Sequence, residues 1–396
     1  MKNRLFILTF LFIHASIVSI QSIDEIFING HLYVQMLCCI SSIGVCFNNG
    51  LTFYYRYKKL NRVCILFFIS CCISTFLIWQ QPPFHLASPF TSLLYALKVI
   101  SSLFVIEYVQ HNKMSRHFLS FIFKIICLYL FIADISVLRL PIADYGGRDI
   151  CFLGNKFTLS YLHLFMCPLF YKLYRPYERD KTQNKILYFL ILAWVAYISF
   201  YVQCTTVLIA PFIILLCHIV HKYIYNIVSN FLFVISSILI LDIGMLIYFA
   251  LLIQNDVFNQ IIFALGEDSS LTGRTIIWNA IISILPNRPL WGFGPANSTY
   301  VVGNLLGLTN AQNGLIDAYL SIGAIGLVLY FYVLYSIYNL VRYNKENLAL
   351  YYFLVCLVIF SVVEITIDER FLVYASFLLL TNYKKESQCL IQRCHY

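Results

Sequence analysis

Long apolar segments alternate with short polar stretches from one end of the chain to the other. A helix of about 20 residues crosses the hydrocarbon core of a membrane and satisfies its own backbone hydrogen bonds. The short alternating segments that are typical of membrane β-barrels are not visible. The pattern therefore predicts an all-α fold, a polytopic transmembrane helix bundle of about 12 spans. The predicted spans are 5–20, 31–53, 63–79, 91–109, 117–137, 157–174, 186–201, 204–221, 228–253, 314–341, 349–366 and 370–383.

The placement of charge along the chain predicts how this bundle is oriented. The 396 residues are 61% hydrophobic and 11% charged, with a net charge of +9. Of the 27 Lys and Arg residues, 19 fall on the side that holds both termini and 6 on the opposite side. The positive-inside rule then places both termini in the cytoplasm. The basic excess follows from topology, so we expect no nucleic-acid partner.

The sequence carries no pattern for a metal, a cofactor or a second domain. Most of its 14 cysteines lie in predicted spans, where Cys behaves as a small apolar residue. No CxxC or Cys/His cluster has metal-ligand spacing, and no GxxxxGKS loop occurs. The predicted cytoplasmic loops are short, so we interpret residues 1–396 as a single membrane domain. We expect no metal and no cofactor.

Two external segments, 139–156 and 254–313, are predicted to form the active site. The second is the longest break between predicted spans, and loops of such length are usually functional or disordered. It is rich in Trp, Pro, Gly and Ile, which argues against disorder.

Within the longer loop, residues 273–285 are apolar but too few to cross a membrane. Their polar positions recur at every fourth residue and give one narrow stripe on a helix. Pro286 is expected to end this helix. We predict a helix that lies in the outer membrane interface or dips into it, with Trp278 near the lipid head groups.

Arg274 lies in the first turn of this predicted helix. A cation is mildly disfavoured there by the helix dipole, unless it shares an anion with the free N–H groups. The residue therefore indicates either an anion site or a side chain that reaches a lipid phosphate. Arg288 follows the helix in an Asn-Arg-Pro turn.

Beyond the loop, Gln312 and Asn313 stand at the mouth of the next predicted span. Asp317 follows Asn313 by four residues and shares its helix face. An acidic residue one turn inside a span is costly and usually faces a polar cavity.

Several other polar residues fall inside predicted spans. Lys98 and Lys124 are expected to pair with acids on neighbouring helices. Asp134 lies near the end of a span and is expected to reach the interface. Asp242 lies in mid-span with no partner that the sequence identifies. His163 is expected to pack within the bundle rather than to act in catalysis.

Three motifs appear in order towards the C-terminal half of the chain. They are Gly273-Arg274-x-x-x-Trp278, then Pro289-x-x-Gly292-x-Gly294, then Gln312-Asn313 followed by Leu315 and Gly323. Together they resemble the O-antigen ligase/Wzy polymerase family. Residues 152–162 also resemble an earlier loop of that family, and Glu364, in the penultimate predicted span, matches an acidic position seen in many of its polymerases.

The resemblance implies a metal-independent glycosyltransferase with many spans, acting on the outer face of the inner membrane. Its donor would be an oligosaccharide on undecaprenyl pyrophosphate, and its product a surface polysaccharide such as O-antigen, capsule or exopolysaccharide. Its partners would include a flippase and a chain-length regulator. External cations would hold the pyrophosphate, which gives Arg274 and Arg288, with Arg148 or Lys156, as substrate-binding residues.

The sequence departs from the family pattern at one position. Gln312 stands where the ligase motif has histidine, and glutamine cannot act as a base at neutral pH. Asp317 and Glu364 are the remaining candidates for the catalytic acid or base, with Trp278, Gln312 and Asn313 positioning substrate. The departure favours a polymerase. The alternatives are a ligase of the same family and a flippase or other transporter, which should show broken spans.

Overall fold

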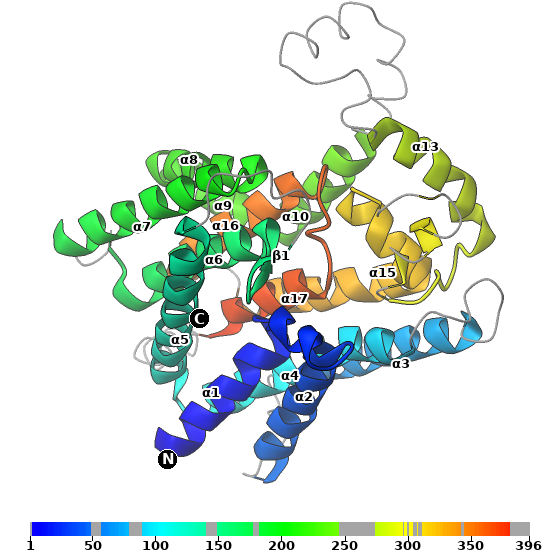
Figure 1. The fold of residues 1–396 in the computed structure, drawn as a ribbon, viewed down its shortest axis with the longest axis horizontal. Helices are drawn as coiled ribbons and strands as arrows, with labels where there is room; N and C mark the ends of the chain where they lie inside the picture. Colours follow the sequence, from blue (N-terminus) through cyan, green and yellow to red (C-terminus); the bar gives the residue numbers. More distant parts are fainter. Residues whose placement is uncertain are drawn as a thin grey trace, which may run out of the picture.

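The computed structural model describes residues 2–48, 57–78, 89–139, 149–176, 182–244, 274–295, 297–298, 301–303, 307, 311–341 and 344–380. These residues are almost entirely helical (Figure 1). The described part of the chain has one short β-hairpin, formed by β1 (Asp149–Cys151) and β2 (Gly154–Asn155). The all-α fold predicted from the sequence is confirmed.

Six helices of the described chain are long and apolar enough to cross a membrane. They are α2 (Gly30–Asn48), α3 (Lys58–Ile78), α4 (Pro89–His111), α5 (Ser115–Leu138), α7 (Thr182–Tyr201) and α15 (Gly314–Leu340). The chain is therefore a helical membrane protein.

The remaining helices are shorter, less apolar or bent. The α-helices are α1 (Lys2–Ser16), α6 (Lys156–Tyr174), α8 (Thr205–Ile219), α9 (His221–Val228), α10 (Phe231–Ile238), α13 (Arg274–Ile284), α16 (Leu348–Phe360) and α17 (Glu369–Ser376). Single turns of other helix types are η1 (Gln21–Glu25), η4 (Leu239–Ile243), η5 (Leu285–Asn287), η6 (Lys345–Asn347) and η7 (Phe377–Leu379). The η4 turn is a π-helix.

The predicted number of about 12 spans is not confirmed. Each predicted span coincides with helical residues, but among the described residues six helices qualify, or seven if α8 and α9, bent by 108°, form one span. The last two predicted spans are too short in the structure. Thr366 Oγ1 donates to the Leu357 carbonyl at 2.6 Å, and the Glu364 N–H donates to the Phe360 carbonyl. These bonds close the end of α16 and start a turn, so the apolar run 349–366 is not one helix.

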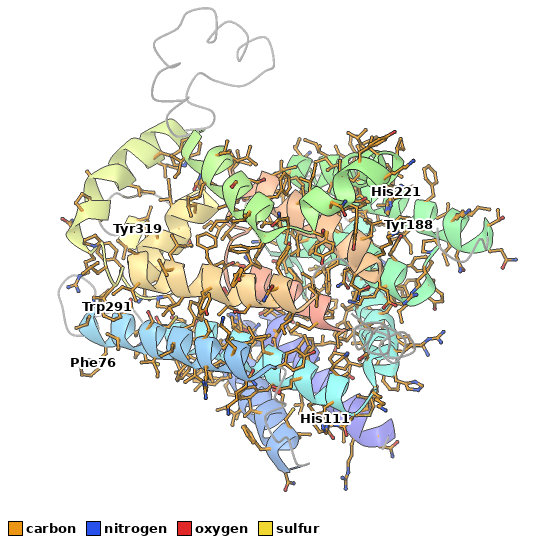
Figure 2. The ribbon with its side chains drawn as sticks, turned by 180° about the vertical axis from the view of Figure 1, so that it is seen from behind. Phe76, His111, Tyr188, His221, Trp291 and Tyr319 are labelled. Atoms are coloured by element: carbon orange, nitrogen blue, oxygen red, sulfur yellow. The ribbon has the colours of Figure 1, made fainter. Side chains whose placement is uncertain are left out.

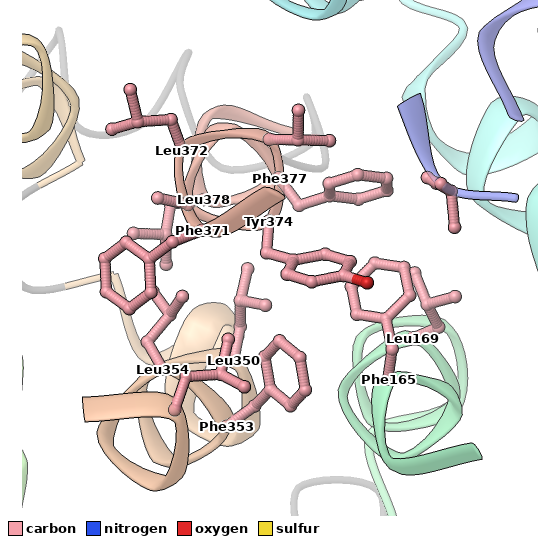
Figure 3. Close-up of a cluster of buried hydrophobic side chains, with 14 of the residues drawn as sticks. Phe165, Leu169, Leu350, Phe353, Leu354, Phe371, Leu372, Tyr374, Phe377 and Leu378 are labelled. Carbon is pink, nitrogen blue, oxygen red and sulfur yellow. The ribbon is translucent and has the colours of Figure 1, made fainter. Parts of the chain in front are cut away.

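The short final helices lie inside the molecule rather than against lipid. Side chains of α6, α16 and α17 form a buried cluster around Phe165 and Tyr374, whose ring centres are 4.5 Å apart (Figure 3). By contrast, α5 and α7 expose large apolar side chains such as Phe131 and Phe200. Exposed apolar faces on long helices are expected where lipid is the solvent. The C-terminal helices and α6 therefore belong to the main core, which extends through most of the bundle.

Candidate functional site

The segment after α13 runs back across α15 and meets it at a break. Within α15, Gly323 has φ +64° and ψ −174°, values that no α-helix contains. Three backbone hydrogen bonds join the two segments: Phe293 N to Leu320 O at 2.6 Å, Ala324 N to Pro289 O at 2.9 Å, and Ile325 N to Leu290 O at 3.1 Å. Backbone groups freed by a break in a membrane helix need such partners. Residues 289–293 supply them.

Two motif glycines meet at this junction. Gly292 has φ +68°, and its own Cβ would lie 2.6 Å from the Gly323 N atom. A Cβ on Gly323 would lie 2.4 Å from the Gly292 N atom. Both positions therefore require glycine, for conformation and for the close approach of two backbones. The motifs 289–294 and 312–323, separate in the sequence, form one structural unit.

Helix α13 begins at Arg274 and passes into η5 at Leu285, close to the predicted limits. The Trp278 side chain is enclosed by protein and does not face lipid, and its predicted depth near the head groups stays a prediction. Its side chain is buried in an apolar cluster with residues of α3 and α15, including Ile78 and Leu320. Its Nε1 donates to the Ala311 carbonyl at 3.1 Å. These contacts lie inside the protein, and through them the Trp278 side chain anchors α13 to the bundle.

The contacts of the α13–α15 segment place it at one end of the bundle. Ser74, near the end of α3, donates to the Trp291 carbonyl, and Ser92, near the start of α4, donates to the Pro295 carbonyl at 2.6 Å. Trp291 lies near Phe76, at the end of the molecule away from His111 (Figure 2). The start of α15 therefore lies at the same end as the α3–α4 connection. We call this end the junction end.

Asn313 is fully buried and caps α15. Its Oδ1 accepts from the Ile316 N–H at 3.0 Å, and its Nδ2 donates to the Val362 carbonyl at 3.4 Å. An N-cap of this kind satisfies one of the open donors at a helix start. Gln312, half-buried, has φ +49° in the left-handed region. Both predicted positioning residues thus have a part in the turn into α15.

Asp317 lies in the first turn of α15 and is 8% exposed. The Ser298 side chain lies beside its carboxyl group, and the charges of Asp368, Glu369 and Arg370 influence it. Its Oδ1 accepts no hydrogen bond from the described residues. The acid therefore faces a polar cluster, as expected for a carboxylate inside a membrane protein.

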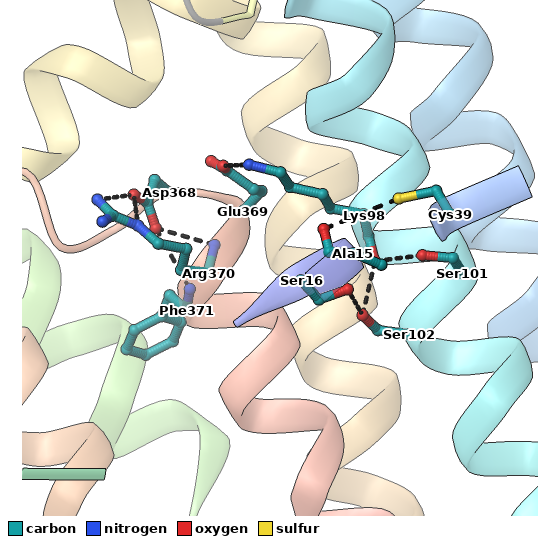
Figure 4. Close-up of polar contacts among 10 residues, drawn as sticks. All are labelled: Ala15, Ser16, Cys39, Lys98, Ser101, Ser102, Asp368, Glu369, Arg370 and Phe371. Carbon is teal, nitrogen blue, oxygen red and sulfur yellow. Dashed lines mark hydrogen bonds and ion pairs between the residues drawn. The ribbon is translucent and has the colours of Figure 1, made fainter. Parts of the chain in front are cut away.

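That cluster is built from residues 368–370, which sequence reasoning did not select. Asp368 caps α17 through a hydrogen bond from the Arg370 N–H at 2.9 Å, and its Oδ2 accepts from Arg370 Nε at 2.6 Å. Glu369 Oε1 lies 3.1 Å from Lys98 Nζ (Figure 4). The expectation that Lys98 pairs with an acid is confirmed. Burial raises the pKa of Asp368 above its usual value, against the opposing charge of Arg370.

Arg370 joins this cluster to a cavity. Its side chain is 43% exposed, whereas the Asp368 side chain is 10% exposed. The cavity is lined by Tyr161, Leu357, Ile365, Thr366, Asp368, Arg370 and Tyr374. A guanidinium has five N–H donors, and Asp368 accepts from only part of them. The signal in the sequence was Asp-Glu-Arg directly before an apolar run, which marks a capped helix start.

Glu364 lies close enough to the cavity residue Tyr161 for its charge to influence the phenol. The charges of Glu364 and Lys156 both influence the Cys204 thiol, which lies outside the cavity lining. Lys156 begins α6 and its Nζ donates to the Gln203 carbonyl at 3.4 Å. Glu364 is half-buried in the turn after α16 rather than in a span, because α16 ends at Phe360.

The other predicted phosphate ligands are not joined to the cavity by the contacts of the described residues. Arg288 is half-buried at the end of η5, and its carbonyl accepts from the Gly292 N–H at 3.1 Å. Arg148 and the side chain of Arg274 lie outside the part of the chain that the structure describes.

Asp242, whose partner could not be identified from the sequence, lies at the start of α15. Ser361 Oγ donates to its Oδ2 at 2.8 Å, and the Leu315 N–H and the Asn313 side chain lie beside the carboxyl group. A carboxylate is favoured at a helix N-terminus by the helix dipole. Asp242 therefore stabilises the start of the helix that carries Asp317.

The chain is thus a helical membrane protein with a polar site at the junction of α4, α15 and α17. No protein-family model matches the chain, and the search of curated proteins found no similar sequence. Among the described residues, no group of three or more His, Cys, Asp or Glu side chains is placed to hold a metal ion.

Proposed function

We propose that this protein polymerises oligosaccharide repeat units carried on undecaprenyl pyrophosphate into a surface polysaccharide. The observation that carries the proposal is that two charged groups with unused hydrogen-bonding capacity lie in one polar cluster. Arg370 presents an exposed guanidinium to a cavity, and the nearby Asp317 has a carboxylate oxygen without a hydrogen bond from the described residues. The motif resemblance of residues 273–323 supports the same function.

The two groups have complementary roles in glycosyl transfer. The acceptor hydroxyl attacks the anomeric carbon of the donor sugar, and the bond from that carbon to pyrophosphate oxygen breaks. Arg370 stabilises the charge that develops on the pyrophosphate, since guanidinium binds phosphate oxygens in a bidentate way. Asp317 takes the proton from the acceptor hydroxyl. Lys156 and the external Arg274, Arg288 and Arg148 remain proposed ligands of the lipid pyrophosphate.

The proposal includes an orientation in the membrane. If both termini lie on the cytoplasmic side of the inner membrane, the junction end faces outward. Lipid-linked repeat units would be joined on that outer face. A flippase would deliver these units, and a chain-length regulator would act with the polymerase. A ligase of the same family would use the same donor with a different acceptor.

A transporter is the second candidate, and one observation favours it. Broken spans are typical of transporters, and this chain has them. Helix α15 is broken at Gly323, and α8 and α9 are bent by 108°. The break in α15 is filled by the backbone of residues 289–293, however, which supports a structural junction rather than an open pathway.

Replacement of Arg370 by Lys and of Asp317 by Asn tests the proposed roles. Arg370→Lys keeps the positive charge but removes the bidentate donors of the guanidinium, and we expect polymer formation to fall about 100-fold. Asp317→Asn removes the proposed base and should lower polymer formation about 100-fold or more. Polymer length on gels and the amount of folded protein are measured together. Arg116→Lys, a change at the opposite end of the bundle at the start of α5, is the matched control. Full-length polymer in both site variants would remove this assignment.

A further inference from the structure

The direction of the Arg370 guanidinium is set by the Asp368 side chain. Asp368 Oδ2 accepts from Arg370 Nε at 2.6 Å and lies 2.5 Å from Nη2 of the same residue (Figure 4). One edge of the guanidinium is therefore occupied within the protein. Two of its five N–H donors are used in this way, and three remain for a ligand in the cavity that Arg370 lines.

The same carboxylate ties this direction to the backbone. Asp368 Oδ1 accepts from the Arg370 N–H at 2.9 Å and from the Phe371 N–H at 3.4 Å, which caps α17. One side chain thus holds both the first turn of the helix and the guanidinium. A shift of the backbone at residues 368–370, which we call the arginine turn, would therefore move the guanidinium as well.

The arginine turn is fixed to α15 by the hydroxyl of Tyr330. This hydroxyl donates to the Asp368 carbonyl at 3.0 Å. Tyr330 is fully buried, and its ring packs edge to face against Phe67 of α3, with the ring centres 6.2 Å apart. Lys98 also reaches the turn from a neighbouring helix, but it contacts the Glu369 carboxylate rather than the backbone. Tyr330 therefore holds the backbone of the turn directly.

Helix α15 carries both Tyr330 and Asp317. The two residues lie on opposite sides of the break at Gly323, where the backbone of residues 289–293 fixes how the two halves of the helix meet. Tyr330 therefore sets where Arg370 lies relative to the proposed base. The geometry of reacting groups matters at this scale, since a misplacement of about 1 Å can lower a rate about 100-fold.

We propose that Tyr330 is a positioning residue for the glycosyl transfer described above, and that its hydroxyl holds Arg370 in place relative to Asp317. This role rests on the proposed function, in which Arg370 binds the pyrophosphate. Tyr330 itself does not touch the substrate, because it is fully buried and does not line the cavity.

Tyr330→Phe removes the hydroxyl and keeps the ring packing. We expect the rate of polymer formation per folded protein to fall about tenfold, because the arginine turn loses its contact with α15. The amides of Arg370 and Phe371 should exchange hydrogen about fivefold faster, which corresponds to about 1 kcal/mol for one lost hydrogen bond. Initial rates of the purified full-length protein with lipid-linked repeat units measure the first effect, and hydrogen exchange followed by mass spectrometry measures the second.

A double variant separates positioning from a general loss of structure. In Arg370→Lys protein, Tyr330→Phe should lower the remaining rate by less than about twofold, since the guanidinium that it positions is gone. A merely structural role would lower the rate by the same factor in both backgrounds. Tyr338→Phe is the matched control. Tyr338 is also buried on α15, and its hydroxyl makes no hydrogen bond with the described residues, so this change should alter neither rate nor exchange.

The rates distinguish this role from the proposed function. A full rate in Tyr330→Phe, or an equal loss in both backgrounds, would overturn the positioning role and leave the proposed function standing. A full rate in Arg370→Lys would contradict the assignment of Arg370 and the role that rests on it. A loss by Tyr330→Phe that is confined to protein with Arg370 would support both.

Discussion

Replacing Gly323 by alanine is expected to destroy the junction between α15 and the segment that follows α13. The backbone at Gly323 lies in a region that other residues adopt only at a cost of about 1–3 kcal/mol. The added Cβ would lie 2.4 Å from the Gly292 N atom, which is backbone and cannot turn aside. Separation of the two segments would also leave their three hydrogen bonds unmade. We expect a loss of more than about 4 kcal/mol, measured as lost monodisperse protein and lowered Tm.

Gly44 provides the matched control for this change. It also lies in a long membrane helix, but a Cβ there meets no atom within 4 Å. Gly44→Ala is therefore expected to leave Tm unchanged or raise it slightly. Gly292→Ala should resemble Gly323→Ala, because its Cβ would meet the same junction from the other side. Equal Tm values for Gly323→Ala and Gly44→Ala would contradict the broken-helix junction.

Lys98→Met is expected to destabilise the protein by about 3–5 kcal/mol, the usual cost of leaving one partner of a buried ion pair uncompensated. Lys98 and Glu369 are each 14% exposed and 3.1 Å apart, and they join α4 to the start of α17. The remaining Glu369 would lie beside Asp368 with Arg370 as its nearest counter-charge. Thermal unfolding in detergent measures the effect.

Two further variants separate charge from packing at this pair. Lys98→Met combined with Glu369→Gln removes both charges, so most of the lost stability should return. Lys124→Met removes an exposed lysine from the middle of α5 and should change Tm little. A double variant no more stable than Lys98→Met alone would show that packing of the lysine stem, not its charge, holds α17 in place.

Much of the fold follows from local patterns in the sequence. Apolar runs of sufficient length predicted the long helices, and the short run before Pro286 predicted a separate helix at α13. These features depend on neighbouring residues, which a sequence displays directly. The number of spans could not be predicted from neighbouring residues alone. The apolar run 349–366 is divided by a turn, and the hydrogen bonds of that turn form only when the chain folds.

The site was predicted only in part, for the same reason. Asp317 was selected because an acid inside an apolar span stands out, and it lies in the polar cluster. Arg370 was not selected, since its cavity forms only when α6, α17 and the turn after α16 come together. The motif glycines were recognised as a pattern, but their mutual contact across the α15 break is a tertiary feature that spacing alone cannot show.

The proposed function is tested most directly by the glycans on the carrier lipid of cells that lack this protein. A polymerase predicts that such cells accumulate single repeat units on undecaprenyl pyrophosphate and make no long polymer. Restoring the unmodified chain should return long polymer, and restoring Arg370→Lys should not. Long polymer in the cells without the protein would contradict the account.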